Sequence, residues 1–108
     1  MDLTSILEKA GFDVEEASNF DEALSKLNGG GCRLDALITD VQMPGAMNGY
    51  ALAKRVHELF PHAAIVVISG LTKPSPEEIP PTATFLAKPV SPEHLLGAVR
   101  SGLKALNR

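Results

Sequence analysis

The sequence predicts an α/β fold in which a parallel β-sheet lies between two layers of helices. Three short apolar runs, at residues 36–38, 65–68 and 85–87, each end in turn residues, as buried strands of a parallel sheet do. Apolar residues at helical spacing occur in the segments around these runs, and the connecting loops are short. Alternation of this kind implies parallel strands joined by right-handed crossovers.

The first part of the chain predicts a helix, a strand and a second helix. Apolar residues recur at helical spacing in residues 3–10, and Gly11 follows where a left-handed C-cap residue is wanted. Residues 12–17 alternate between apolar and polar side chains, which predicts a half-buried or edge strand. Asn19 is a good N-cap for the next helix, whose apolar stripe consists of Phe20, Ala23, Leu24 and Leu27.

A third helix and the central strand are predicted next. Asn48 is a good N-cap for a helix over residues 49–60, and Pro61 ends that helix. The inward face of this helix is expected to hold Leu52, Val56 and Leu59. Residues 63–68 form the most aliphatic segment, so we expect a central strand that is covered on both faces.

The last part of the chain predicts a strand and a long final helix. Residues 73–81 contain four prolines, so any helix there is limited to a turn or two. Residues 82–87 predict the last strand. Ser91 caps the final helix, which begins with a proline and an acidic first turn. The inner face of this helix is expected to hold Leu95, Leu96, Val99, Leu103 and Leu106.

Three polar residues follow the three apolar runs: Asp40, Ser69 and Lys88. Because the carboxyl ends of parallel strands meet at one edge of a sheet, we expect these side chains to converge there. In open α/β sheets that edge is where ligands bind. Each residue alone is explained by a surface turn, but the three in register indicate a functional site.

Composition narrows the possible functions. With 108 residues, the chain is expected to form a single domain over residues 1–108. The net charge of −3 and the absence of Lys/Arg clusters argue against binding to nucleic acid or to an anionic membrane. No aliphatic run is long enough to cross a bilayer and no basic leader precedes one, so a cytoplasmic location is expected. Cys32 is alone, which excludes a disulfide framework and a zinc site.

Three motifs resemble those of the receiver domain of two-component response regulators. They are Asp-Val-Gln-Met-Pro-Gly at 40–45, Val-Ile-Ser-Gly at 67–70 and Phe-Leu-Ala-Lys-Pro at 85–89, and the resemblance runs from Asp2 to about Leu106. It implies a flavodoxin-like three-layer fold with strand order 2-1-3-4-5. The family's first strand, central in that order, is absent from this chain. We therefore expect an N-terminally incomplete receiver domain of a longer functional protein, with no output domain.

The resemblance also implies roles for the residues at the strand ends. Asp40 would be the phosphoacceptor, and it would bind Mg²⁺ together with the backbone carbonyl of Gln42. Ser69 would donate its hydroxyl to the phosphoryl oxygens, and Lys88 would pair with them.

Two further expectations come from the resemblance. Phe85 would be the aromatic residue whose rotamer follows the state of Ser69, and the peptide bond before Pro89 would be cis. More ordinary interpretations stay open: Ser69 as a turn residue, Phe85 as core and Lys88 as a solvated lysine. The three histidines are interpreted as surface residues away from the strand ends: His57, His62 and His94.

Two functional interpretations follow. The first is a phosphorelay receiver, in which a histidine kinase or histidine phosphotransfer protein donates to Asp40 and a downstream protein binds the last strand and last helix. Such a domain is not an enzyme beyond self-catalysed phosphotransfer and dephosphorylation. The second is a pseudo-receiver, a phosphate-independent interaction module, because the acidic pair that completes the receivers' Mg²⁺ site is absent from this chain. A flavin or nucleotide enzyme is disfavoured because no Gly-rich phosphate loop is present.

Overall fold

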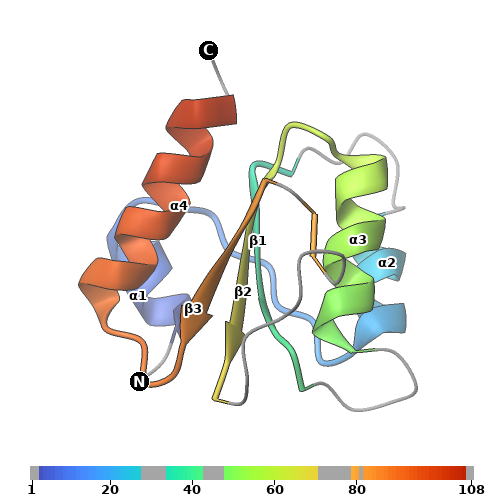
Figure 1. Ribbon diagram of the computed structural model, residues 1–108, viewed down its shortest axis with the longest axis horizontal. Helices are drawn as coiled ribbons and strands as arrows, with labels where there is room; N and C mark the ends of the chain where they lie inside the picture. Colours follow the sequence, from blue (N-terminus) through green and yellow to red (C-terminus); the bar gives the residue numbers. More distant parts are fainter. Residues whose placement is uncertain (1–2, 28–33, 43–47, 71–78, 81, 107–108) are drawn as a thin grey trace.

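The computed structural model shows a parallel sheet with helices on both of its faces (Figure 1). The structure describes residues 3–27, 34–42, 48–70, 79–80 and 82–106. The helices in these ranges are α1 (Leu3–Lys9), α2 (Phe20–Leu27), α3 (Gly49–Leu59) and α4 (Pro92–Leu106). The strands are β1 (Ala36–Asp40), β2 (Ala64–Ser69) and β3 (Ala83–Ala87).

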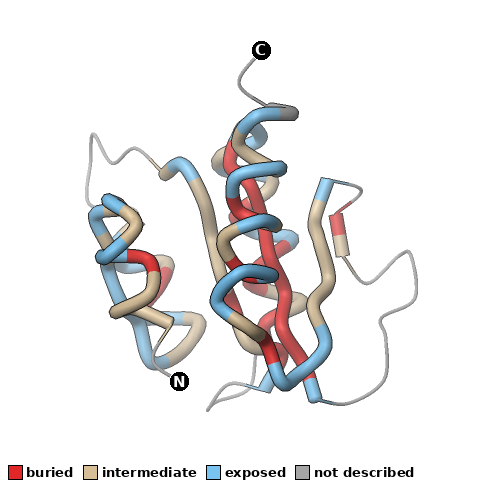
Figure 2. Tube along the Cα trace, turned by 90° about the vertical axis from the view of Figure 1, so that its left-hand side faces the viewer, coloured by how far each residue is buried: buried red, intermediate tan, exposed pale blue. Residues whose placement is uncertain are grey.

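The sheet has β2 at its centre. The strand order is β1-β2-β3, and both pairs are parallel. All six residues of β2 are buried, as predicted for a strand that is covered on both faces (Figure 2). This order matches the last three positions of the expected order 2-1-3-4-5. The predicted α/β class, with a parallel sheet between helical layers, is confirmed.

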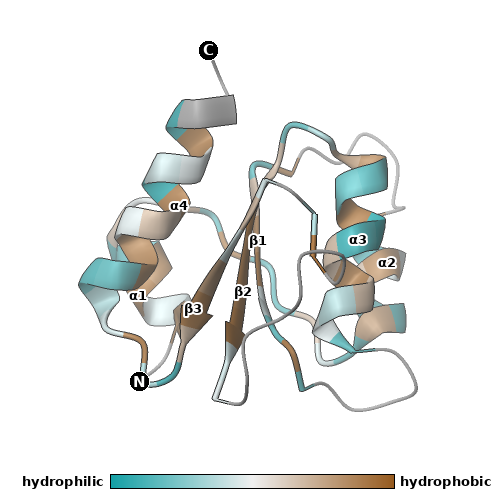
Figure 3. Cartoon of the chain, viewed as in Figure 1, coloured by the Kyte–Doolittle hydropathy of each residue, from teal (hydrophilic) through white to brown (hydrophobic). Residues whose placement is uncertain are grey.

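Two apolar cores lie on the two faces of the sheet. Helices α2 and α3 cover one face, and α1 and α4 cover the other (Figure 1). Successive residues of β2 point alternately into the two cores: Ile65 and Val67 pack with α2 and α3, and Val66 and Ile68 pack with α1 and α4. Figure 3 shows hydrophobic strands and helices that alternate between hydrophobic and hydrophilic residues. We call these clusters the α2–α3 core and the α1–α4 core.

The helix ends follow the predicted capping residues. Gly11 has a left-handed φ of +99° and ends α1, and the Phe12 N–H donates to the Leu7 carbonyl at 3.1 Å. Three N-cap side chains accept hydrogen bonds from backbone N–H groups in the first turn: Asn19 from Glu22 at 2.8 Å, Asn48 from Ala51 at 3.0 Å and Ser91 from His94 at 3.1 Å. The caps therefore fix where α2, α3 and α4 begin.

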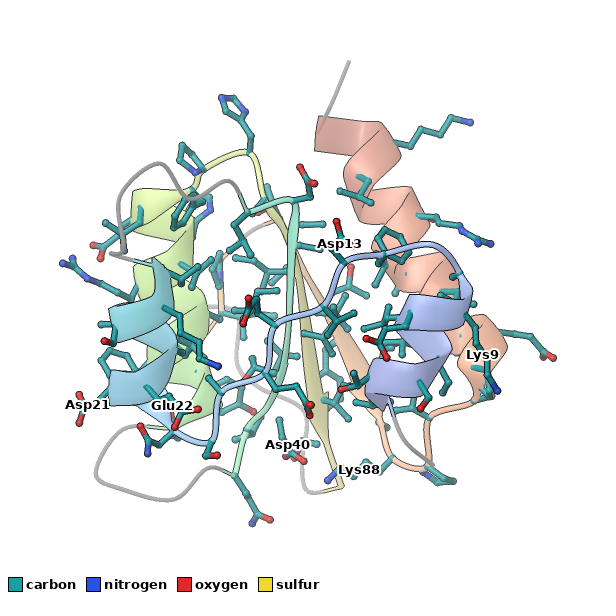
Figure 4. All side chains as sticks on the ribbon, turned by 180° about the vertical axis from the view of Figure 1, so that it is seen from behind. Lys9, Asp13, Asp21, Glu22, Asp40 and Lys88 are labelled. Atoms are coloured by element: carbon teal, nitrogen blue, oxygen red, sulfur yellow. The ribbon has the colours of Figure 1, made fainter. Side chains whose placement is uncertain are left out.

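The strand predicted over residues 12–17 was wrong. Its alternation is present in the structure, because Phe12 and Val14 pack against the α1–α4 core while Asp13 and Glu15 are exposed. However, none of the described backbone hydrogen bonds joins this segment to a strand. It crosses the sheet on its way from α1 to α2 (Figure 4). Alternation buries one side of an extended segment, but a strand also needs a neighbour with which to exchange hydrogen bonds.

The inward position predicted for Leu59 was also wrong. Leu52 and Val56 are buried in the α2–α3 core as expected, but Leu59 is 38% exposed. Its helical spacing is correct, yet it is the last residue of α3. Because the chain leaves the helix there, Phe60 packs against the core in its place.

Two predictions fall largely or wholly outside the described residues. The proline-rich segment 73–81 is described only at residues 79–80, and the side chain of Leu106 is not described. The other expected inner residues of α4 line the α1–α4 core, with Leu95 and Val99 buried and Leu96 and Leu103 partly buried. Within the described chain, none of the helices has the length and apolar character needed to cross a membrane.

Candidate functional site at the strand ends

The sheet brings three polar residues to one edge. Asp40 ends β1, Ser69 ends β2 and Lys88 directly follows β3. In the strand register Asp40 lies beside Ile68, and Ser69 lies beside Ala87. The backbone N–H of Lys88 donates to the carbonyl of Ser69 at 2.9 Å, so the ladder between β2 and β3 continues to Lys88.

Asp40 and Lys88 form an ion pair at this edge of the sheet. The Nζ atom of Lys88 lies 2.5 Å from Oδ2 of Asp40, although the two residues are 48 positions apart in the sequence (Figure 4). The other carboxylate oxygen, Oδ1, accepts a hydrogen bond from the backbone N–H of Gln42 at 3.2 Å. Both carboxylate oxygens of Asp40 therefore have a donor.

The ion pair is open to solvent. The Asp40 side chain is 40% exposed and the Lys88 side chain is 48% exposed. Exposed pairs of this kind contribute about 0–1 kcal/mol to stability, because water screens them and ordering two long side chains costs entropy. The pair therefore adds little to the stability of the fold, and a small anion in solvent has access to both charges.

Ser69 and Phe85 lie on the face of the sheet that is directed toward the α2–α3 core. Ser69 is only 1% exposed, and it already has an interaction partner. Strand alternation puts it on the same face as Val67, in the direction of the α2–α3 core. Phe85 pairs with Val67 in the register and packs partly buried against that core. The serine and the aromatic ring expected to respond to it thus occupy the same face of neighbouring strands.

The loop after β1 begins at the site. Val41 is buried, and its N–H donates to the Ile68 carbonyl at 3.0 Å, which extends the β1–β2 ladder by one residue. Gln42 is exposed. The remainder of the first motif, residues 43–45, lies outside the described residues. At the end of the third motif, the Lys88–Pro89 peptide bond is cis.

Two residues of the site were missed by the sequence analysis. The buried hydroxyl of Thr39 donates to the carbonyl oxygen of Asp40 at 3.0 Å. Gly49, the first residue of α3, is so close that a Cβ added to it would lie 2.1 Å from the same oxygen. A glycine immediately after a good N-cap residue was a signal in the sequence, because glycine is a poor helix former.

The described residues offer few metal ligands. They contain no group of three or more His, Cys, Asp or Glu side chains that could hold a metal ion. His62 and His94 are exposed, as expected for surface residues. His57 differs from that expectation, because it is partly buried and its Nδ1 atom has no hydrogen-bond partner among the described residues.

Comparison with known proteins agrees with this fold. A family model described as the response regulator receiver domain matches residues 1–100. The response regulator protein TodT of Pseudomonas putida is 34% identical over 110 residues, which cover 94% of this chain and 45% of TodT. The chain therefore spans less than half the length of this relative.

Solved structures extend the agreement to three dimensions. A response regulator receiver protein from Sinorhizobium medicae is 31% identical and superimposes with a TM-score of 0.83, over 94% of this chain and 82% of that chain. A CheY-like receiver domain protein from Methanospirillum hungatei is 26% identical with a TM-score of 0.79, over 96% of this chain and 83% of that chain. The shared fold thus includes nearly all of the chain.

Proposed function

Because the chain belongs to the response regulator receiver family, we propose that it accepts a phosphoryl group on Asp40 from a histidine kinase or a histidine phosphotransfer protein. The observation that carries this proposal is the contact between the Lys88 ammonium and the Asp40 carboxylate at the carboxyl edge of the sheet. A carboxylate that is already beside a cation is prepared to receive an anionic group.

The proposed reaction is a single phosphoryl transfer. A carboxylate oxygen of Asp40 forms a bond to phosphorus, and the bond from phosphorus to the donor's histidine nitrogen breaks, with the electron pair left on nitrogen. The obstacle is charge, because one anion must approach another. Lys88 lowers that obstacle, since its ammonium can turn from Oδ2 of Asp40 to the incoming phosphoryl oxygens. Ser69 would then donate its hydroxyl to a phosphoryl oxygen.

Magnesium is the expected cofactor of this transfer, and the donor set allows a weak site. Asp40 would supply a carboxylate and Gln42 its backbone carbonyl, with water completing the coordination. Mg²⁺ sites commonly use one or two carboxylates together with waters and phosphate oxygens, so these donors meet the minimum. A bound Mg²⁺ would add positive charge beside the developing phosphoryl charge. With a single carboxylate at the site among the described residues, we expect low affinity for the metal.

Phosphorylation would be communicated through Ser69 and Phe85. If the phosphoryl group draws the Ser69 hydroxyl toward itself, the packing around Phe85 on the α2–α3 face would change. Phe85 belongs to β3, and residues 88–91 join β3 to α4. We propose that a downstream protein reads the change on the surface formed by β3 and α4, so the domain signals by protein–protein contact and is not an enzyme beyond its own phosphotransfer and dephosphorylation.

A pseudo-receiver is the second candidate function. Two observations favour it: both carboxylate oxygens of Asp40 already have donors, and Ser69 is buried. A carboxylate whose two oxygens are already paired, beside a buried serine, would suit a phosphate-independent interaction module. The two functions differ in one outcome, namely whether any phosphoryl group is accepted.

Incubation with acetyl phosphate and Mg²⁺, followed by intact mass spectrometry, tests the proposal. We expect one added phosphoryl group, lost in Asp40→Asn and retained in Asp13→Asn, a matched control at an exposed carboxylate between α1 and α2. Modification that persists in Asp40→Asn would overturn the assignment. A wild-type chain that remains unmodified would favour the pseudo-receiver.

A further inference from the structure

We propose that Gly49 and Thr39 are positioning residues that hold the Asp40 carboxylate in its reactive orientation through the two peptide units that follow Asp40. The effect of this positioning on phosphotransfer rests on the proposed function, whereas the positioning itself does not. Neither residue belongs to the three motifs that identified the site, and the contacts that support this role are with backbone atoms of Asp40 and Val41.

Gly49 is required at the start of α3 by close approach. A Cβ on this residue would lie 2.1 Å from the Asp40 carbonyl oxygen, 2.8 Å from the Asp40 carbonyl carbon and 2.9 Å from the Val41 Cα. These distances are far inside the usual non-bonded separation of about 3.5 Å, so only hydrogen fits. The backbone conformation does not impose glycine, because Gly11 is the only described residue with positive φ.

Gly49 also forms a hydrogen bond with the next peptide unit, which joins Val41 to Gln42. Its N–H donates to the Val41 carbonyl oxygen at 2.9 Å. That carbonyl and the N–H of Gln42 belong to one planar peptide, in which the C=O and N–H bonds point in opposite directions. The same Gln42 N–H donates to Oδ1 of Asp40 at 3.2 Å. The hydrogen bond from Gly49 therefore sets the direction of the N–H that holds the carboxylate.

Thr39 holds the preceding peptide from the other side. Its hydroxyl donates to the Asp40 carbonyl oxygen at 3.0 Å, and the residue is only 5% exposed. The Asp40 carbonyl thus meets a hydroxyl donor from β1 and the bare Cα of Gly49 from α3. With both peptide units fixed, Asp40 presents one carboxylate oxygen to Gln42 and the other to Lys88.

The test substitutes Gly49→Ala and compares it with Gly97→Ala. Gly97 lies in α4, where an added Cβ would meet nothing within 4 Å, so the same chemical change has no steric consequence. We expect Gly49→Ala to shift the ¹⁵N and ¹H resonances of Gln42 and the carbonyl ¹³C resonance of Asp40 without any phosphodonor. Phosphorylation by acetyl phosphate should slow by roughly 10²-fold, the effect of misplacing a reacting group by about 1 Å. Gly97→Ala should change neither.

Thr39 supplies a gentler pair of variants in case Gly49→Ala does not fold. Thr39→Val has nearly the same shape but no hydroxyl, and Thr39→Ser keeps the hydroxyl. We expect Thr39→Val to shift the same resonances and to slow phosphorylation. Thr39→Ser should keep the resonances and the phosphorylation rate close to those of the wild type.

The outcomes separate this inference from the proposed function. Wild-type resonances of Asp40 and Gln42 in folded Gly49→Ala, or in Thr39→Val, would overturn the positioning role. Shifted resonances together with an unchanged phosphorylation rate would overturn its relevance to transfer. A wild-type chain that takes no phosphoryl group would overturn the proposed function, while the resonances would still decide the geometry.

Discussion

Removing the charge of Lys88 should impair phosphotransfer while leaving the fold nearly as stable as before. Lys88→Met keeps most of the length of the side chain and deletes the ammonium that lies 2.5 Å from Asp40 Oδ2. Coulomb's law in water gives about 1.7 kcal/mol for two unit charges at that distance. Side-chain ordering and exposure of both groups reduce the net stabilisation of such pairs to about 0.2–1 kcal/mol.

A double-mutant cycle measures this pair directly. The wild type, Lys88→Met, Asp40→Asn and the double variant are unfolded with urea, and the coupling energy follows from their four free energies of unfolding. We expect a coupling below about 1 kcal/mol that decreases as salt is added. Lys54→Met, at an exposed lysine of α3, is the matched control and should change stability by no more than about 0.5 kcal/mol.

The same variants separate stability from chemistry. Lys88→Met should accept phosphoryl groups far more slowly than Lys54→Met, because the approaching anion would no longer meet a cation at Asp40. A coupling energy above about 3 kcal/mol would show that the pair is desolvated and would refute the reasoning on exposure. Phosphorylation of Lys88→Met at the wild-type rate would refute the role of its charge.

Five other substitutions have defined outcomes. Ser69→Ala should still accept a phosphoryl group but weaken the resulting chemical-shift changes in β3 and α4, and a full response there would exclude coupling through the hydroxyl. In urea unfolding, Leu95→Ala should lose about 2–5 kcal/mol because Leu95 is fully buried, whereas Leu59→Ala should lose much less because Leu59 is 38% exposed. Equal losses would contradict the assigned core. Gly97→Ala should raise stability by about 1 kcal/mol. Gly102→Ala should not, because its Cβ would lie 2.8 Å from the Cβ of Ala64, and a matching gain would contradict that contact.

Much of the fold follows from local patterns in the sequence. The aliphatic run of residues 63–68 predicts the buried central strand β2, and the caps at Asn19, Asn48 and Ser91 predict three helix starts within one residue. These signals are local, because burial on both faces and capping depend on residues close in sequence. Once the strands are taken as parallel, the arrival of Asp40, Ser69 and Lys88 at one edge follows from topology alone.

The errors concern what local patterns cannot contain. Residues 12–17 have the alternation of a strand, but strand formation depends on a hydrogen-bonding neighbour, which is set by tertiary structure. Leu59 has the spacing of the inner face, but its burial depends on where α3 ends. The close approach of Gly49 to Asp40 depends on how α3 is placed against β1, and no sequence spacing specifies that distance.

Locating the phosphoryl group on the chain tests the central claim most directly. The chain is phosphorylated with acetyl phosphate and Mg²⁺, digested, and mapped by mass spectrometry, with a parallel sample treated with hydroxylamine, which cleaves acyl phosphates. We predict a single modified peptide containing Asp40, with a phosphoryl group that hydroxylamine removes. A stable phosphoryl group on Ser69 or another hydroxyl, or the absence of any modified peptide, would contradict the claim.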